Sequence, residues 1–211
     1  MHPNPIFRQT PAARNLAFAR LRGFGVLTVN GPAAPLVAHV PFVLSQDGTS
    51  AELHLMRSNP IARALGAPQP ALLAVSGPDG YVSPDWYGLA DQVPTWNYVA
   101  VHLGGTLRML EPGDLAGVLD RLSAASEGRL APKAPWTSAK MPADLMARLM
   151  RSIIAFRLNI ASVEGTWKLG QNKPATARTG AADGLATAAI GAETGALAGL
   201  MRAVDSDPAA P

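Results

Sequence analysis

The chain has 211 residues, of which 48% are hydrophobic and 16% are charged, and this composition fits one globular domain with appendages. It contains no cysteine, which excludes disulfides, thiolate catalysis and thiolate metal sites. The formal net charge of +3 is small and the basic residues are scattered, so no nucleic-acid-binding face is indicated. Since we find neither an apolar run of about 18 residues nor a signal-peptide pattern, we expect a cytoplasmic protein without a membrane span.

The first third of the chain alternates short strand patterns with turn signals. Thr10-Pro11 has the residue types of a helix N-cap and first helical position, and this helix is expected to stop at Gly23. Asn59-Pro60 is expected to open a short helix that ends at Leu65. Strands are predicted over 24–29, 35–44, 52–56 and 71–76, with turns at 30–31, 46–48 and 77–80.

The rest of the chain contains the longest strand pattern, at 96–110, which Gly104-Gly105 is expected to bend or bulge. Helices are predicted over 114–126 and 142–151, and a final strand over 153–163. About six strands with short turns indicate a mainly β fold with peripheral helices, built as a small barrel rather than a βαβ sheet.

Composition changes after Pro174 to alanine, glycine and threonine, which predicts a barrel domain over 1–174 and an Ala/Gly-rich helix or tail over 175–211. A loose apolar stripe in this segment is expected to pack on the barrel or on a partner subunit. The last six residues, 206–211, are expected to be disordered.

Aromatic residues concentrate between Gly77 and Gly105, where all three tyrosines and two of the four tryptophans lie. Such stiff, amphipathic rings suit either a surface that stacks against a flat ligand or a core corner with a subunit contact. Both interpretations stay open on chemistry alone. The residues are Tyr81, Trp86, Tyr87, Trp96 and Tyr98.

This block, with "YVSPDWY" followed by "VPTWNYVAVHLGG", resembles the PaiB-type FMN-binding transcriptional regulators. The resemblance runs from Pro5-Ile6-Phe7-Arg8 to the segment 168–173, although His2 and Gln9-Thr10 depart from the family's usual opening. It implies the FMN-binding split β-barrel of pyridoxamine-phosphate-oxidase-like flavoproteins, and a homodimer with FMN at its interface.

The segment 54–60 leaves a strand and enters a helix, and at such a corner related proteins hold the FMN phosphate. A phosphate needs a fixed cation, a hydroxyl and free backbone N–H groups. Arg57, Ser58 and the helix start supply these, so we assign Met56, Arg57, Ser58 and Asn59 to the phosphate site. Alternatively, Ser58 or Asn59 is a plain N-cap and Arg57 a surface residue.

The resemblance also places the isoalloxazine ring along the strand that carries His39, Val40 and Pro41. His39 is the expected polar contact, and backbone groups beside Pro41 are expected to meet the ring edge. Asn97 shares a strand face with Val99, so it is assigned together with Trp96 to the ring edge or the subunit interface.

The segment after Glu164 is similar to the closing strand of the oxidase superfamily. Its polar residues are expected to complete the site from the second subunit: Lys168, Gln171, Asn172 and Lys173. The oxidase pattern ends in a substrate-binding His and Arg, which this chain lacks, and this argues against pyridoxamine phosphate oxidation.

The family label implies a negative transcriptional regulator that binds DNA, yet no helix-turn-helix is evident, and the segment 137–151 is the best substitute. The competing class is an FMN-dependent oxidoreductase or flavin reductase, for which no catalytic residue stands out. A flavin store or sensor without turnover is a third class. Haem is a further alternative, with His39, His54 or His102 as an axial ligand.

Overall fold

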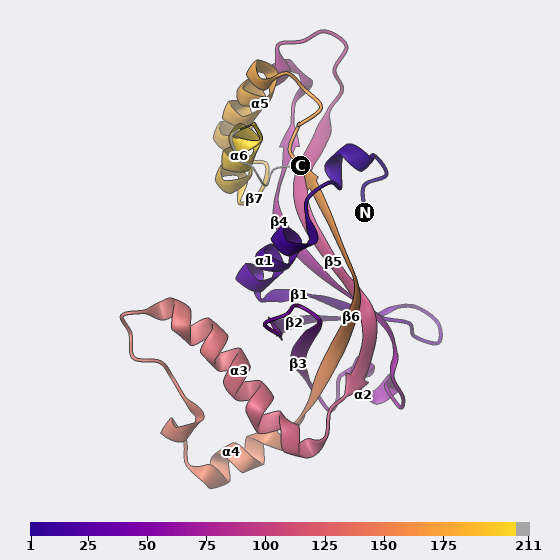
Figure 1. The fold of residues 1–211 in the computed structure, drawn as a ribbon, viewed down its shortest axis with the longest axis vertical. Coiled ribbons are helices and arrows are strands. Elements are labelled where there is room, and N and C mark those ends of the chain that lie inside the picture. The colour runs from indigo at the N-terminus through magenta and orange to yellow at the C-terminus, as the bar shows by residue number, and fades with distance from the viewer. Residues whose placement is uncertain (206–211) are drawn as a thin grey trace. The chain divides into compact units, whose positions relative to one another are not determined.

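The computed structural model describes residues 1–205, so the expectation for 206–211 lies outside the described residues. The chain divides into two compact units (Figure 1). The barrel unit comprises Ala19–Ala74 and Leu103–Ser162. The terminal unit comprises Met1–Phe18, Val75–His102 and the residues from Val163 onward. Four elements contribute residues to both units: α1 (Ala12–Arg22), β4 (Gln69–Val82), β5 (Thr95–Met109) and β6 (Ile153–Lys168).

The barrel unit is a closed ring of six antiparallel strands, as the sequence predicted. It contains β1 (Phe24–Val29), β2 (Leu36–Leu44) and β3 (Ser50–Met56), with residues 153–162 of β6, 103–109 of β5 and 69–74 of β4. The strand order is β1-β2-β3-β6-β5-β4, and pairing of Val26–Val29 with Ala71–Ala74 closes the ring.

Strict alternation along β2 shows why these residues form a barrel wall. Ala38, Val40, Phe42 and Leu44 are buried, while the residues between them are more exposed. Because side chains of a strand alternate between its two faces, one face fills the interior and the other faces outward. The helices of this unit are α2 (Pro60–Ala64), α3 (Leu115–Glu127) and α4 (Ala143–Met150), with 3-10 turns at Pro112–Asp114, Gly128–Leu130 and Ser138–Lys140.

An ion-pair cluster ties α3 to the barrel wall. Glu52 of β3 accepts from Arg121 of α3 at 2.7 Å and from Arg157 of β6 at 2.6 Å. Burial alone would raise the pKa of Glu52, but the hydrogen bonds from both arginines outweigh it and lower the pKa. The carboxylate therefore remains charged and links three elements of the barrel unit.

Gly104 and Gly105 lie inside the continuous strand β5, where the backbones of β5 and β6 approach closely. A Cβ on Gly105 would overlap the backbone oxygen of Asn159, and one on Gly104 would lie 2.6 Å from the hydroxyl of Ser162. Glycine at these positions thus permits a close backbone approach.

We predict that Gly105→Ala lowers the free energy of unfolding by about 1–3 kcal/mol or more, because the obstructing atom is backbone and cannot rotate away. Gly113→Ala is the matched control, since nothing lies within 4 Å of its added Cβ. The control is expected to change stability by less than about 0.5 kcal/mol. Chemical denaturation of both variants is the measurement, and equal stability of the two would contradict the close approach.

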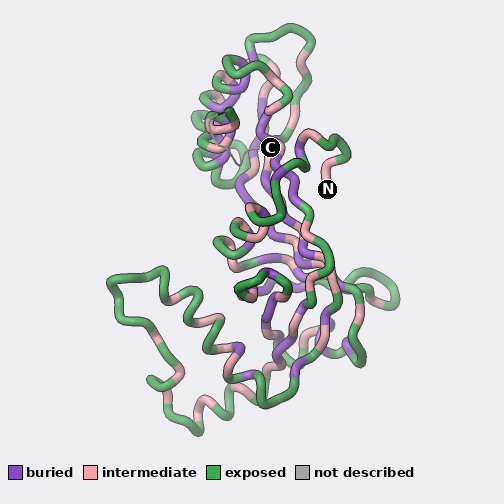
Figure 2. The backbone as a smooth tube through the Cα atoms, viewed as in Figure 1, coloured by how far each residue is buried: buried purple, intermediate pink, exposed green. Residues whose placement is uncertain are grey.

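The terminal unit packs two helices against strand segments. Residues 75–82 of β4, 95–102 of β5 and 163–168 of β6 belong to it, with β7 (Gly191–Ala192) paired to β4. The helices are α5 (Ala175–Ala188) and α6 (Thr194–Ala203), and 3-10 turns lie at Pro5–Phe7 and Pro84–Tyr87. Buried residues from the three strand segments, the Pro84–Tyr87 turn, α5 and α6 form one core, visible as the purple stretches of α5, β4 and β5 in Figure 2: Val82, Tyr87, Val99, Trp167, Leu169, Leu185, Leu197 and Met201.

Two local predictions were wrong in this unit. The turn expected at 77–80 is absent, because β4 continues through it to Val82. A Cβ on Gly77 would lie 2.6 Å from the ring of Phe18, and one on Gly80 2.5 Å from Leu185. These glycines therefore admit neighbouring side chains. Thr10 does not cap α1, since its buried hydroxyl has no hydrogen-bond partner among the described residues.

Part of the aromatic block forms a core corner. Tyr87 is buried, and Trp86 packs against α5, where a Cβ on Gly184 would overlap its indole. Tyr81 meets Trp86 edge to face, with ring centroids 6.3 Å apart. The glycines of α5 thus provide the groove that accepts Trp86. No helix in the described part of the chain is long and apolar enough to span a membrane.

Candidate functional site

The barrel unit has an opened strand ladder between β2 and β3. The two strands pair only where Phe42–Leu44 meets Ala51–Leu53. Before this point β2 pairs with β1 alone, and after it β3 pairs with β6 alone. One backbone edge of 36–41 and one of 54–56 thus have no strand partner in the described pairings, so their N–H and C=O groups can serve a ligand.

Three predicted ring contacts lie on one side of this opened ladder. His39 and Pro41 are exposed, and the imidazole of His39 stacks on Phe24 with ring centroids 6.4 Å apart. Val40 is only 1% exposed and points into the barrel core. Its side chain therefore cannot reach a ligand on the outer face, and only its backbone remains available.

The predicted phosphate residues continue from the other side of the opened ladder. Extending the β2–β3 register would set Met56 opposite His39, and Met56 is 52% exposed. Arg57 and Ser58 are exposed as well. Asn59 caps α2 with its side-chain oxygen, which accepts from the N–H of Ile61 at 2.9 Å. Asn59 is therefore the N-cap residue of α2, and Ser58 is not.

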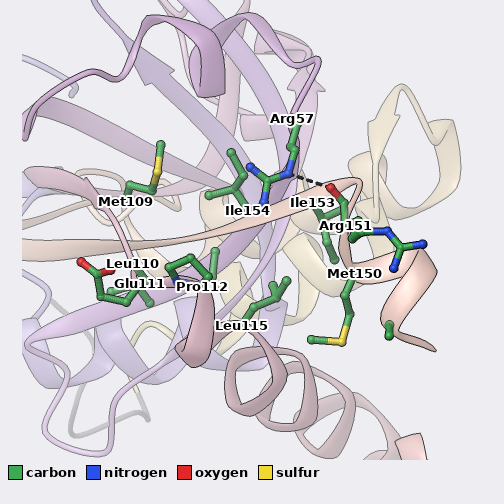
Figure 3. A pocket seen from close by; sticks show the side chains of 12 residues that line it. Arg57, Met109, Leu110, Glu111, Pro112, Leu115, Met150, Arg151, Ile153 and Ile154 are labelled. Atoms are coloured by element: carbon green, nitrogen blue, oxygen red, sulfur yellow. Dashed lines mark hydrogen bonds between the residues drawn. The ribbon is translucent and has the colours of Figure 1, made fainter. Parts of the chain in front are cut away.

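The guanidinium of Arg57 is held by one atom, and it lines a cavity of the barrel unit. Its Nε donates to the carbonyl of Arg151 at 2.7 Å, the dashed line in Figure 3. Its backbone N–H donates to the carbonyl of Ser152 at 2.8 Å. These two bonds fix the guanidinium beside a cavity of about 460 Å³ that the sequence did not predict. Residues of β5, α3, α4 and β6 line it, among them Met109, Leu115, Met150, Ile153 and Ile154.

The terminal unit contains a second, more polar pocket of about 280 Å³. Four of the predicted site residues line it: Asn97, Lys168, Asn172 and Lys173. The Lys168 ammonium donates to the hydroxyl of Thr95, and that of Lys173 donates to the side-chain oxygen of Gln92. Burial lowers the pKa of Lys168.

The two remaining predicted residues of this unit are not part of the pocket lining. Trp96 is 47% exposed and, by strand alternation, lies on the face opposite Asn97. Gln171 folds back on the chain, where its oxygen accepts from the N–H of Leu169 at 2.8 Å and its nitrogen donates to the carbonyl of Trp167 at 2.7 Å. Gln171 thus shapes the turn that presents its neighbours.

Several lining residues were missed by the sequence analysis. Thr95 lies two residues before Asn97 and shares its strand face, so alternation alone could have identified it. Gln92 and Asp91 sit in a loop without periodicity, and His2 and Phe7 come from the N-terminal segment, where no sequence feature pointed to this pocket. The described residues contain no cluster of three or more His, Asp or Glu side chains that could hold a metal ion.

Comparisons with solved structures place the fold among flavoproteins. The FAD and haem binding protein of Mycobacterium smegmatis matches with a TM-score of 0.56 at 19% identity, over 78% of this chain and 74% of that chain. The flavocytochrome Anf3 of Azotobacter vinelandii matches with a TM-score of 0.57 at 16% identity, over 79% and 72%. The barrel therefore has the split-barrel fold of these proteins.

The sequence comparisons are more specific. Residues 1–162 match the family described as "Putative FMN-binding domain". The chain is 29% identical over 178 residues to the protease synthase and sporulation protein PAI 2 of Bacillus subtilis, covering 83% of this chain and 84% of that protein. An uncharacterized Emericella nidulans protein is 27% identical, over 76% and 80%. The chain thus belongs to the PaiB-type family of flavin-binding split-barrel proteins.

We predict that substitutions at two neighbouring amides differ in their effect on stability. Gln171→Ala removes the hydrogen bonds to Leu169 and Trp167, so the free energy of unfolding should fall by about 1–3 kcal/mol. Asn172→Ala alters an exposed amide at the pocket rim and should change it by less than about 0.5 kcal/mol. Denaturant titrations of both variants test this, and a larger loss for Asn172→Ala would refute the structural role of Gln171.

Proposed function

We propose that this chain binds FMN at the opened ladder of the barrel unit. The observation that supports it is the loss of β2–β3 pairing beyond Phe42 and Leu53, where the predicted ring and phosphate residues flank the opening. Unpaired backbone groups along 39–41 suit the polar edge of an isoalloxazine ring. The two terminal guanidinium nitrogens of the exposed Arg57 and the hydroxyl of Ser58 suit a terminal phosphate.

The protein's part in this site is binding and orientation. When bound, a flavin supplies hydride or electron transfer by itself. His39, held against Phe24, presents its imidazole beside the ring position, and Val40 contributes backbone groups only. Lys168, Asn172 and Lys173 of a second subunit are the proposed contacts across the dimer interface, with the exposed Trp96 at the ring edge. Asn97 is buried on the opposite strand face, so its side chain is not assigned to the ring.

We propose that the protein acts in the cytoplasm as an FMN-dependent negative transcriptional regulator. Its similarity to a protein named for protease synthesis and sporulation supports a regulatory role. The DNA-binding face would be the region of α4, where Lys140, Arg148 and Arg151 are exposed. DNA affinity that falls steeply with salt would support this role. Sustained NAD(P)H oxidation by the holoprotein without DNA binding would instead indicate a flavin reductase.

We predict that Arg57→Ala weakens FMN binding by about 10- to 100-fold, because a charge-assisted hydrogen bond to phosphate is worth about 1.5–3 kcal/mol. Riboflavin, which lacks the phosphate, should bind the variant as it binds the parent. Arg63→Ala removes another exposed arginine, in the last turn of α2, and is the matched control. Fluorescence titration of the apo-proteins measures all affinities.

Equal weakening of FMN and riboflavin by Arg57→Ala would remove the phosphate assignment. The absorption spectrum of the purified protein distinguishes the cofactors, since flavins absorb at about 450 nm and haem at about 410 nm. A haem spectrum without flavin peaks would overturn the proposal.

We predict a homodimer at micromolar concentration. Large apolar side chains are exposed on the strands of the barrel unit, with Phe24 and Val37 each 54% exposed and Met56 52% exposed. Exposed apolar surface of this kind usually marks an interface. Sedimentation should give about twice the chain mass of 21.9 kDa. A monomer that still binds FMN with full affinity would rule out a shared site.

A further inference from the structure

The pocket of the terminal unit gathers cationic groups without matching anions. Two lysines, Lys168 at the end of β6 and Lys173 before α5, line the same space of about 280 Å³. Their hydrogen-bond acceptors are neutral, the hydroxyl of Thr95 and the amide oxygen of Gln92. Neither lysine has an ion pair with a carboxylate in the described part of the chain, so their charges remain uncompensated.

The other polar groups of the pocket include further hydrogen-bond donors. Asn97 is 1% exposed, and its side-chain nitrogen has only the weak acceptor Met201 Sδ, at 3.5 Å. Asn172 and His2 add an amide and an imidazole. Asp91 is the one carboxylate among the lining residues; it is exposed and makes no described ion pair with either lysine.

Desolvation makes this arrangement costly in the absence of a ligand. Burial lowers the pKa of Lys168, which means that the surroundings disfavour its charged form. An anion bound in the pocket would compensate the positive charges of the two lysines. Two ammonium groups with amide and imidazole donors match the two charges and several acceptor oxygens of a phosphate monoester better than the single charge of a carboxylate.

The surrounding structure holds these donors in place. The buried guanidinium of Arg178 donates to the carbonyl of Lys173 at 3.2 Å and to that of Met201 at 2.9 Å, and it forms an ion pair with Asp205. These contacts attach the turn that contains Lys173 to the end of α6. A binding site with such supporting contacts needs little reorganisation when a ligand arrives.

We propose that this pocket is a phosphate-binding site, separate from the flavin phosphate site at Arg57. Its volume exceeds that of a phosphate group and leaves room for a compact organic part. The rings of Phe7 and Tyr87 are the apolar surface for that part, with Lys168 Nζ 5.9 Å and Lys173 Nζ 5.5 Å from their respective centroids. The ligand class is a small phosphate monoester other than FMN, that is, a phosphorylated metabolite.

The test uses the full chain and inorganic phosphate as the probe, measured by calorimetry on the apo-protein and on the FMN-loaded protein. Lys168→Met combined with Lys173→Met should weaken phosphate binding by at least about 10-fold, because both charge-assisted contacts are lost. Lys140→Met removes an exposed lysine of the barrel unit and should leave it unchanged. Lys168→Arg keeps the charge and should retain most of the binding. Thermal melting verifies that each variant is folded.

Two phosphate sources give different results, and only one supports a separate site. For a separate metabolite, the FMN-loaded protein binds inorganic phosphate about as tightly as the apo-protein does. If the pocket instead held the phosphate of FMN, inorganic phosphate would compete with FMN, and that result would overturn the proposal. Loss of FMN in Arg57→Ala with retained phosphate binding would leave the pocket proposal intact.

The proposal is overturned if neither form of the parent protein binds phosphate up to about 10 mM. It is also overturned if the folded double variant binds phosphate as the parent does. If the double variant does not fold, the phosphate affinity of the single variant Lys173→Gln is compared with that of the parent protein. Lys173 lies at a turn outside the helices and strands.

Discussion

Pairing of β1 with β4 is the constraint on which the barrel unit depends. It closes a sheet that would otherwise end in two open edges, and it buries Leu27 and Leu73. Closure requires the strands to approach so tightly at Gly25 that a Cβ there would lie 2.8 Å from the carbonyl of Ala74. With the ring closed on this side, the partial pairing of β2 with β3 leaves backbone groups available between these two strands.

The fold was predictable because alternation and turn chemistry act locally. Four of the six barrel strands were predicted within two residues at each end, while β4 and β6 run five or six residues further than predicted. Asn59-Pro60 correctly marked the start of α2. The turn predicted at 77–80 was wrong for a physical reason, since glycine occurs both in turns and where neighbouring groups pack closely. The sequence alone does not reveal that Phe18 and Leu185, distant along the chain, occupy the space above Gly77 and Gly80.

The candidate sites were predictable in part for the same reason. Residues near the ends of strands, such as Arg57 and Lys168, follow from the element boundaries and the family motifs. The partners that define their chemistry come from elsewhere in the chain: the carbonyl of Arg151 for Arg57, and Thr95 for Lys168. Periodicity within one segment carries no information about such pairs. Adjacent polar residues also have different roles, which composition does not reveal. The side chain of Gln171 is hydrogen-bonded to the backbone, whereas that of Asn172 is available to a ligand.

The C-terminal helices α5 and α6 determine the shape of the pocket in the terminal unit. The family match ends at residue 162, yet α5 and α6 supply Arg178 and Met201, which position Lys173 and Asn97. The part of the chain beyond the family match therefore shapes a polar pocket, while the closure of the barrel rests on residues within the match. Substitutions in α5 and α6 could thus alter what the pocket accepts without touching the contacts that close the barrel.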